Sequence, residues 1–586
     1  MDSGSIDAHA TEPIIYTLRF AAPQTHYVDV EAEYPTSDRP TIDLFMAVWT
    51  PGSYLVREYE RHVEHVQARG SADAVLSVQK IAKNRWRVAT GGAPRVTVTY
   101  RVYGREMTVR NNWIEAGFAM LNGAPTFISL VGELARPHEV RIELAPGWSA
   151  SATALTPVIG KAHVYRADNF DTLVDSPIVL GNPVQREFTV GGKCHVAVFE
   201  GDPSLIDIER VTEDLRKIVE AAARLMGGRI DYPHYHFLNM VVEAGGGLEH
   251  TNCCLVMTNR FTTRTRRAYV GYLSLVAHEF FHAWNIKRLR PIELGPFDYE
   301  AEVYTSALWM CEGFTDYYAA LLPRRAGLST HDEFFEELSS HIETLQTTPG
   351  RLVRSAAMAS FDAWIKQYRP DENTPNTTIN YYTKGAVIAF LLDARIRRAT
   401  GGEKSIDDAI RHAYERYSTT RGFTLEEFYQ TMSEVAGTDL RPWFARTAES
   451  TEELEYTEAL EWFGLRFRPI EAGRAWIGAT TRNRGGRVLV SQVRRETPAH
   501  IAGLNVDDEI VAIDDIRVRA DGLASRLEQY RPGAKVSLLV ARRDRLMRLE
   551  MILAVEPARA WRLEPLPNAT VEQKRRIADW LGPANL

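Results

Sequence analysis

The stretch Gly271-Tyr-Leu-Ser-Leu-Val-Ala-His-Glu-Phe-Phe-His-Ala-Trp-Asn-Ile286 decides how this chain is organised. Its apolar residues recur at the three-to-four spacing of a buried helix, and His278 and His282 interrupt that apolar surface. Residues four apart share one helix face, so both imidazoles can reach a single ion while Glu279 projects beside them. This is the HExxH pattern, in which two histidines bind zinc and the glutamate acts as a general base. Two buried rings without a partner would be costly, which favours a metal site over two structural histidines.

A third ligand is needed, because zinc held by two histidines alone is incompletely coordinated. The apolar and aromatic run Ala307-Leu-Trp-Met-Cys-Glu-Gly-Phe-Thr-Asp-Tyr-Tyr318 contains two carboxylates, Glu312 and Asp316, four residues apart. We expect Glu312 to be the third ligand. We expect Asp316 to accept a hydrogen bond from one of the two imidazoles and so fix its tautomer. The alternative for either residue is an ordinary capping or surface acid.

Composition excludes several classes of protein. The 586 residues, 45% of them hydrophobic, predict several domains with large cores, while a net charge of −7 and a pI near 6.2 argue against nucleic-acid binding. No apolar run is long enough to cross a bilayer. The first ten residues are polar and acidic, unlike a secretory signal. Only four cysteines occur, so a framework of disulfide bonds is not expected. We therefore expect a cytoplasmic protein, with the periplasm possible if a signal peptide has been removed.

Changes of pattern along the chain predict a multidomain α+β protein. Residues 1–172 alternate apolar and polar side chains, as in Val28, Val30 and Ala32, and predict an antiparallel β domain. Residues 173–455 change to helical periodicity and predict a mostly α catalytic domain that contains the metal site. Residues 456–556 have β character again, and 557–586 form a tail with one short helix.

A glycine-rich segment follows the predicted strand 237–242. It reads Glu243-Ala-Gly-Gly-Gly-Leu-Glu-His250, and Gly246 and Gly247 would let a substrate strand lie along a sheet edge. Glu249, at the end of that edge, is a candidate to pair with a free α-amino group. The alternative is a simple turn.

A tyrosine pair precedes a later helix. The segment Ile379-Asn-Tyr-Tyr-Thr-Lys-Gly385 leads into a helix that we expect from Ala386 to Arg395. A tyrosine hydroxyl at that position could stabilise a tetrahedral oxyanion. The pattern leaves open whether Tyr381 or Tyr382 does so, or whether both only pack.

The last part of the chain resembles the PDZ domains of bacterial proteases. The resemblance lies in the segment from Glu496 to Asp514, with a short helix before Ala502-Gly-Leu504 and a strand from Ile510 to Asp514. Trp476-Ile-Gly-Ala-Thr480 stands where such domains capture a peptide's C-terminal carboxylate. Peptide binding and a purely structural module both remain open.

Several motifs in the right order resemble the PDZ-containing glycyl aminopeptidase family. They are Trp49-Thr-Pro-Gly-Ser-Tyr54, Gly246-Gly-Leu-Glu-His250, the HExxH residues with Trp284-Asn-Ile-Lys-Arg-Leu-Arg-Pro291, Cys311-Glu-Gly-Phe-Thr-Asp316, Tyr382-Thr-Lys-Gly385 and the PDZ segment. The resemblance implies a thermolysin-like catalytic domain between the β domain and the PDZ domain. It also implies one Zn²⁺ per chain and the removal of N-terminal Gly or Ala from peptides.

Carried over by position, the resemblance makes His278, His282 and Glu312 the zinc ligands and Glu279 the general base. It makes Tyr382 the oxyanion donor and Glu249 the carboxylate that recognises the substrate's free amine. His250 replaces the Asn that is usual in the related aminopeptidases.

The gap between His282 and Glu312 is longer than in those enzymes. An insertion at Leu294-Gly-Pro-Phe-Asp298 explains the difference, but Glu300 and Glu302 remain alternative ligands. Two other functions also stay open: a zinc endopeptidase with PDZ-assisted substrate binding, and a non-catalytic peptide-binding scaffold.

Overall fold

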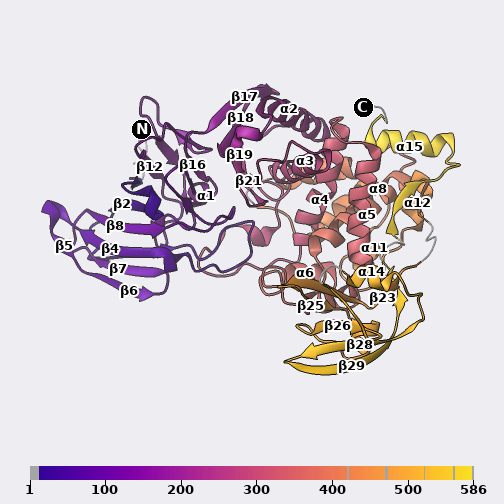
Figure 1. Cartoon of the computed structure of the whole chain (residues 1–586). Coiled ribbons are helices and arrows are strands. Elements are labelled where there is room, and N and C mark those ends of the chain that lie inside the picture. Colours follow the sequence, from indigo (N-terminus) through magenta and orange to yellow (C-terminus); the bar gives the residue numbers. More distant parts are fainter. Residues whose placement is uncertain (1–11, 419–420, 469–472, 520–521, 558–560, 584–586) are drawn as a thin grey trace. The chain divides into compact units, whose positions relative to one another are not determined.

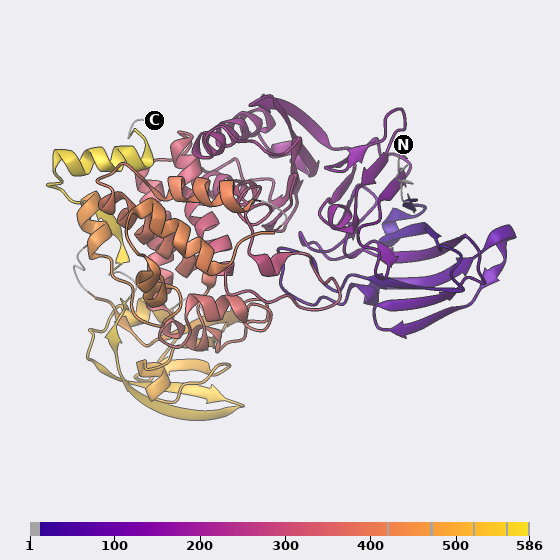
Figure 2. The same cartoon turned by 180° about the vertical axis from the view of Figure 1, so that it is seen from behind.

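The computed structural model describes residues 12–418, 421–468, 473–519, 522–557 and 561–583. The chain divides into two compact units (Figures 1 and 2). The first unit comprises Met1–Arg288 and Leu294–Val303, and the second comprises Leu289–Glu293 and Tyr304–Leu586. A search of the described ranges for a helix with the length and hydropathy to cross a membrane found none.

The first unit begins with three sheets. Two long strands, Tyr27–Pro35 and Arg95–Tyr103, alternate buried and half-buried residues, as the pattern at Val28, Val30 and Ala32 predicts. Neighbouring strands are antiparallel, except that β1 and β12 run parallel. The eight-stranded sheet has the order β14-β15-β12-β1-β2-β8-β4-β5. Its strands are β1 (Ile14–Arg19), β2 (Tyr27–Pro35), β4 (Val63–Arg69), β5 (Val75–Leu76), β8 (Arg95–Tyr103), β12 (His138–Glu143), β14 (Thr156–Pro157) and β15 (Val164–Ala167).

Two four-stranded sheets complete this β region. One has the order β13-β16-β10-β9 and the other β11-β3-β7-β6. Their strands are β3 (Thr41–Met46), β6 (Val78–Ala82), β7 (Arg85–Ala89), β9 (Trp113–Ile114), β10 (Ala119–Leu121), β11 (Ile128–Leu130), β13 (Ala150–Thr153) and β16 (Ile178–Gly181). The short helix α1 (Phe170–Val174) ends at Asp175.

A five-stranded mixed sheet follows, in the order β17-β18-β19-β21-β20. Its strands are β17 (Val184–Val190), β18 (Lys193–Gly201), β19 (His234–Val241), β20 (Gly246–Glu249) and β21 (Cys253–Thr258). The amphipathic helix α2 (Ile208–Leu225) packs against β17, and α3 (Arg266–Phe281) packs against β20 and β21. The glycine-rich segment therefore forms the terminal strand of this sheet, in contact with the HExxH helix.

The second unit is built from helices around the pair α4 and α8. The helices are α4 (Leu308–Arg325), α5 (His331–Thr347), α6 (Ala356–Phe361), α7 (Thr374–Thr377), α8 (Tyr381–Ala399), α9 (Ile406–Tyr417), α10 (Leu425–Ala436), α11 (Arg441–Thr447), α12 (Thr457–Phe463) and α15 (Val571–Leu581). Helix α8 begins at Tyr381, five residues before the expected start, because the side chain of Asn380 caps it by accepting a hydrogen bond from Tyr382 N at 2.8 Å.

Helices α4 and α8 approach each other where each carries a glycine. A Cβ atom placed on Gly385 would lie 1.9 Å from the carbonyl oxygen of Trp309, and one on Gly313 would lie 2.3 Å from the Cα of Gly385. No side chain fits in that space. Gly313 directly follows Glu312, and Gly385 lies three residues after Tyr382. The helix crossing therefore fixes the positions of Glu312 and Tyr382 within the second unit.

The C-terminal strands form a sheet with the order β24-β25-β26-β28-β29, and β27 pairs with β26. The strands are β24 (Ala479–Arg484), β25 (Arg487–Val493), β26 (Glu509–Ile513), β27 (Ile516–Arg517), β28 (Lys535–Arg542) and β29 (Arg545–Ile552), with helices α13 (Pro498–Ile501) and α14 (Leu523–Leu527). The short helix and the strand expected between Glu496 and Asp514 are both present. The amide of Asn376 connects this sheet to α7, because it donates to Val493 O and accepts from Arg495 N, each at 2.8 Å.

The tail contributes to the helical part of the second unit. Strand β31 (Leu563–Pro565) pairs with β22 (Leu465–Phe467), and β30 (Ala554–Val555) pairs with β23 (Ala475–Trp476). Trp580 of α15 is fully buried and donates from Nε1 to the hydroxyl of Tyr317 at 2.7 Å. The fold is thus multidomain α+β, with N-terminal antiparallel sheets, a helical middle region and C-terminal PDZ-like strands. The boundaries at 172, 455 and 556 stay predictions.

Substituting Gly385 by Ala should destabilise the second unit, because the new methyl group would overlap the Trp309 carbonyl. We expect a loss of about 1 to 3 kcal/mol or more in the free energy of unfolding, measured by urea denaturation. Gly271→Ala in α3 is the matched control: a Cβ there meets no atom within 4 Å, and replacing a helical glycine should stabilise by up to about 1 kcal/mol. Equal effects of the two substitutions would contradict the close helix crossing.

Candidate active site

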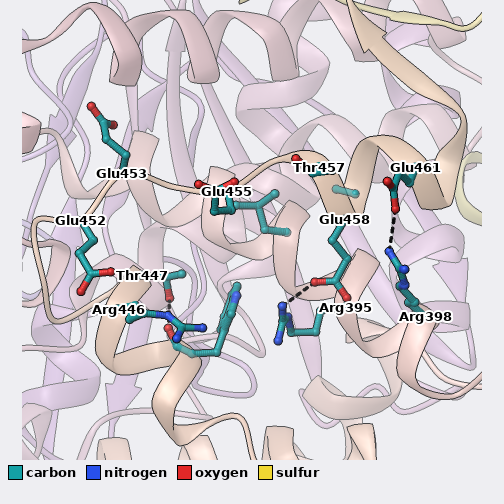
Figure 3. A pocket seen from close by; sticks show the side chains of 13 residues that line it. Arg395, Arg398, Arg446, Thr447, Glu452, Glu453, Glu455, Thr457, Glu458 and Glu461 are labelled. Atoms are coloured by element: carbon teal, nitrogen blue, oxygen red, sulfur yellow. Dashed lines mark hydrogen bonds and ion pairs between the residues drawn. The ribbon is translucent and has the colours of Figure 1, made fainter.

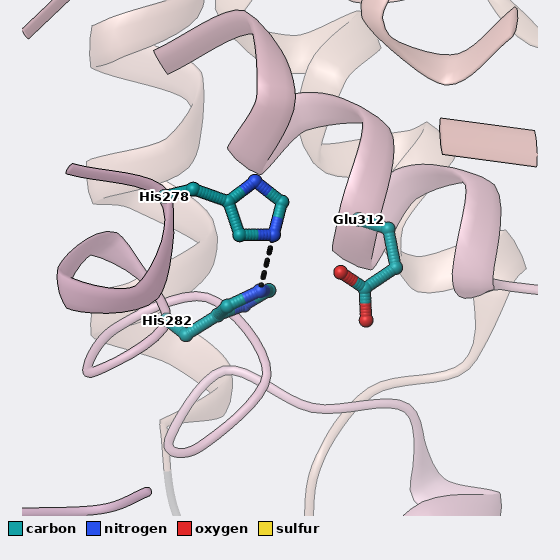
Figure 4. A group of neighbouring side chains, drawn as sticks. All are labelled: His278, His282 and Glu312. Atoms are coloured by element: carbon teal, nitrogen blue, oxygen red, sulfur yellow. Dashed lines mark hydrogen bonds between the residues drawn. The ribbon is translucent and has the colours of Figure 1, made fainter. Parts of the chain in front are cut away.

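Both histidines of the HExxH pattern lie at the end of α3. Thr265 caps the start of this helix, and His282 is its C-cap residue. His278 is 8% exposed and His282 is 1% exposed. The Nδ1–H of His282 donates to the carbonyl oxygen of Asn285 at 2.9 Å, which leaves a lone pair on Nε2. The Nε2 atoms of the two rings lie 3.0 Å apart, so two nitrogen donors converge on one point (Figure 4).

A carboxylate joins this pair. His278, His282 and Glu312 each offer a ligand atom, and these atoms all lie within 4.8 Å of one another (Figure 4). Glu312 is 2% exposed, and burying an ionised carboxylate is costly unless a cation compensates its charge. Two imidazole nitrogens and a carboxylate oxygen are the donor set of many catalytic zinc sites, so these residues fit a zinc ion.

The alternative ligands are placed differently. The carboxylate of Glu300 accepts hydrogen bonds from Arg85 at 2.6 Å and from Asn84 at 2.9 Å. Glu302 is exposed. Neither residue belongs to a group of potential metal ligands in the described part of the chain.

Glu279 lies against the backbone of strand β20. A Cβ atom on Gly247 would stand 2.1 Å from Oε1 of Glu279, so the carboxylate occupies the space that any side chain at position 247 would need. Glu279 is only 5% exposed and has little room to move aside. At Gly246, by contrast, a Cβ would meet no atom within 4 Å. Gly247 is thus the glycine that the close approach requires.

Glu249 is on the same face of β20 as Gly247, since side chains alternate along a strand. Glu249, Glu279 and His282 also offer ligand atoms within 4.8 Å of one another. The carboxylate of Glu249 packs against Gly52, which has a φ of +84° and where a Cβ would lie 2.5 Å from Oε1. The sequence motif around Gly52 therefore contributes to the surroundings of Glu249, and two carboxylates stand beside His282.

Asp175, His250 and Lys287 form a hydrogen-bonded group near Glu249 that the sequence did not predict. Asp175 accepts hydrogen bonds from Lys287 Nζ at 2.7 Å, from His250 Nδ1 at 3.1 Å and from Thr251 N at 2.8 Å. Burial raises the pKa of Asp175, but the charge of Lys287 and the hydrogen bond from His250 outweigh it, and the pKa lies well below its ordinary value. Lys287 and His250 belong to the motifs quoted above, but Asp175 has no sequence signal.

Two further predicted residues are in the second unit. Tyr382 is half-buried in the first turn of α8, where its ring stacks on that of Tyr381 at a centroid distance of 4.9 Å. Burial lowers the pKa of the neighbouring Lys384 to about 8. Asp316 is half-buried on α4, one turn after Glu312. The Nδ1 partner of His282 is the Asn285 carbonyl, so the role of Asp316 as an acceptor stays a prediction.

A separate cavity in the second unit carries no such chemistry. It has a volume of about 790 Å³ and is lined by residues of α8, α11 and α12 and the segment between the last two (Figure 3). Two ion pairs join residues of its lining, Arg395 with Glu458 at 2.6 Å and Arg398 with Glu461 at 3.2 Å. It contains no histidine or cysteine.

Comparison with known proteins agrees with the sequence motifs. A model of the Peptidase M61 N-terminal domain matches residues 15–182, a model of the M61 glycyl aminopeptidase matches 271–388, and a PDZ domain model matches 475–553. A search of curated proteins found no match.

Two solved structures are similar. One is an aminopeptidase N family protein from Idiomarina loihiensis, with a TM-score of 0.91 and 29% identity over 97% of this chain and 100% of that one. The other is Legionella pneumophila aminopeptidase A in complex with aspartic acid, with a TM-score of 0.46 and 15% identity over 75% of this chain and 49% of that one. The second likeness is too weak to carry an argument.

Two groups of potential metal ligands share His282: one contains His278 and Glu312, and the other contains Glu249 and Glu279. Substitutions can tell which group binds the metal. We expect one zinc ion per chain by elemental analysis, removable by a chelator. Glu312→Gln should weaken zinc binding by about 10-fold or more, because it removes a charged ligand, whereas Glu249→Gln should leave binding within a few-fold. The opposite order in a zinc titration would assign the ion to the group that contains Glu249.

Proposed function

The chain belongs to the PDZ-containing glycyl aminopeptidase family and is a peptidase, and we propose that it is a zinc-dependent aminopeptidase that removes N-terminal residues, preferentially Gly or Ala. The observation that carries the proposal is the proximity of Glu249 to Glu279 and His282, within 4.8 Å. The α-nitrogen of a residue lies only about 2.5 Å from its own carbonyl carbon. A carboxylate that binds the substrate's ammonium must therefore stand beside the groups that attack that carbonyl.

The metal ligands in this proposal are His278, His282 and Glu312, with Asp316 orienting one imidazole. When bound, zinc acts as a Lewis acid that lowers the pKa of a coordinated water to about 7. The buried donor set of two imidazoles and one carboxylate supports this choice of metal. Asn285 supports it as well, because its carbonyl holds the tautomer of His282 that binds through Nε2.

Glu279 is the proposed general base. Its carboxylate takes a proton from the attacking water and later gives it to the nitrogen of the leaving amine. The Tyr382 hydroxyl donates a hydrogen bond to the oxyanion that develops on the substrate carbonyl. Glu249 pairs with the substrate's α-ammonium, which sets the cleavage after the first residue.

Gly246 and Gly247 are the proposed substrate-binding backbone. They are in β20, the terminal strand in the order of its sheet, and an extended peptide could add to that strand by main-chain hydrogen bonds. The preference for Gly is supported by the glycyl aminopeptidase model that matches residues 271–388.

The PDZ domain is proposed to bind the C-terminus of a peptide. Strand β24 is terminal in the order of its sheet, so a peptide strand could pair with it. Gly478 before it has a φ of +84°, a conformation that suits a loop of backbone N–H groups around a carboxylate. A cytoplasmic location, also a proposal, is supported by four free cysteines.

Glu279→Gln should keep zinc and lose turnover, because the amide cannot accept the proton. We expect kcat on a glycyl amide reporter to fall by about 10²- to 10⁴-fold with unchanged zinc content. Retained turnover would contradict the role of Glu279.

Two glycine substitutions, one of them a control, test the contact between Glu279 and strand β20. Gly247→Ala should lower kcat by displacing the Glu279 carboxylate, whereas Gly245→Ala should not, since a Cβ at Gly245 meets no atom within 4 Å. Equal activity of the two variants would argue against the contact between Glu279 and β20.

Blocking the substrate's N-terminus should abolish most hydrolysis. We expect N-acetylated peptides to be cleaved at least about 100-fold more slowly than free peptides, because Glu249 would lose its ion pair with the ammonium. Glu249→Ala should reduce kcat/KM for free peptides and remove the discrimination. If the parent protein cleaves free and acetylated peptides equally well, it is an endopeptidase.

A further inference from the structure

We propose that the segment Asn285–Arg288 positions the amine-binding carboxylate, and that Lys287 is a positioning residue for recognition of the substrate's ammonium by Glu249. This inference rests on the proposed aminopeptidase function. The segment directly follows the HExxH helix. Asn285 orients His282, but metal binding and proton transfer assign no role to Ile286, Lys287 or Arg288.

The backbone of this segment is strained at one residue. Ile286 has a φ of +91°, a region that β-branched residues rarely adopt. The turn directs the carbonyl of Asn285 to His282 Nδ1 at 2.9 Å and lets Lys287 N donate to His282 O at 3.2 Å. Strain of this kind persists where surrounding contacts over-determine the conformation, and it is common at functional sites.

Two cationic side chains then connect the segment to the turn that follows Glu249. Lys287 donates to Asp175, which also accepts hydrogen bonds from His250 and from Thr251 N. Arg288 donates from Nη1 to Thr251 O at 3.0 Å and to Ala283 O at 2.7 Å, and from Nη2 to Asn252 Oδ1 at 3.1 Å. The end of strand β20 is therefore held to the end of the HExxH helix by side chains of adjacent residues.

The charges of this group leave room for one more cation. The side chain of Lys287 is 10% exposed and Glu249 is 5% exposed. Burial lowers the pKa of Lys287, but the charges of Asp175 and Glu249 outweigh it and raise that pKa. Two carboxylates, Asp175 and Glu249, thus interact with the single ammonium of Lys287. The ammonium of the substrate would supply a second cation for these two carboxylates.

Lys287→Met in the full-length zinc enzyme tests the proposal with glycyl and alanyl amide reporters. We expect KM to rise by about 10- to 100-fold, kcat to change less than about threefold, and zinc content to stay at the parent value. Lys287→Arg should recover at least part of the lost affinity. Lys217→Met is the matched control, because Lys217 also pairs with a buried aspartate, Asp214, at 3.0 Å, and it should leave KM unchanged.

A double variant shows whether the effect of Lys287→Met comes from the loss of positioning of Glu249 or from an unpaired charge on Asp175. Asp175→Asn with Lys287→Met leaves no unpaired buried aspartate and should fold if the single variant does not. We expect its KM to remain high, since Glu249 still lacks its cation. A normal KM in the double variant, a loss of kcat or zinc in place of a KM effect, or no recovery with Lys287→Arg would each overturn the proposal. Equal cleavage of free and acetylated peptides by the parent enzyme would instead overturn the aminopeptidase function itself.

Discussion

In both units, glycines allow close contacts with the backbone that no other residue would permit. These contacts position the carboxylates of Glu249 and Glu279 and the helices α4 and α8. In the first unit, the missing side chain at Gly247 gives space to the carboxylate of Glu279, and Gly52 does the same for Glu249. In the second unit, Gly385 and Gly313 bring α8 and α4 together. Packed helix axes are ordinarily about 8 to 10 Å apart, depending on the side chains between them, so the smallest residues allow the nearest approach.

Charge compensation is the second requirement. Glu249, Glu279 and Glu312 are each at most 5% exposed, and a buried ionised carboxylate costs several kcal/mol unless a cation or hydrogen bonds satisfy it. For Asp175 the structure supplies Lys287, His250 and a backbone N–H. For Glu312 it supplies two imidazoles as fellow donors, which is the arrangement that a divalent cation stabilises. Three buried carboxylates therefore lie where the proposed chemistry occurs.

The N-terminal sheets, the PDZ strands and the C-terminal tail each contact a few specific residues of the neighbouring parts of their own unit. The turn that contains Gly52 comes from the N-terminal sheets and contacts Glu249, so the β region takes part in the surroundings of a candidate substrate-binding residue. Asn376 connects the PDZ strands to α7, which precedes the helix of Tyr382 by a few residues. The tail adds Trp580 to the core of the second unit through its bond to Tyr317.

Local patterns in the sequence determined the elements and most of the candidate residues. Alternation predicted the strands around Val28, helical spacing predicted α3, and four-residue separations placed His278 with His282 and Glu312 with Asp316 on shared helix faces. The capping of α8 at Asn380 was missed, because an asparagine before two tyrosines is a weak signal beside the apolar run from Ala386. Only the tertiary structure revealed Asp175, the strained turn at Ile286 and the glycine contacts. Periodicity reports which face of an element a residue occupies, whereas hydrogen bonds and steric contacts between residues far apart in sequence depend on how the elements pack.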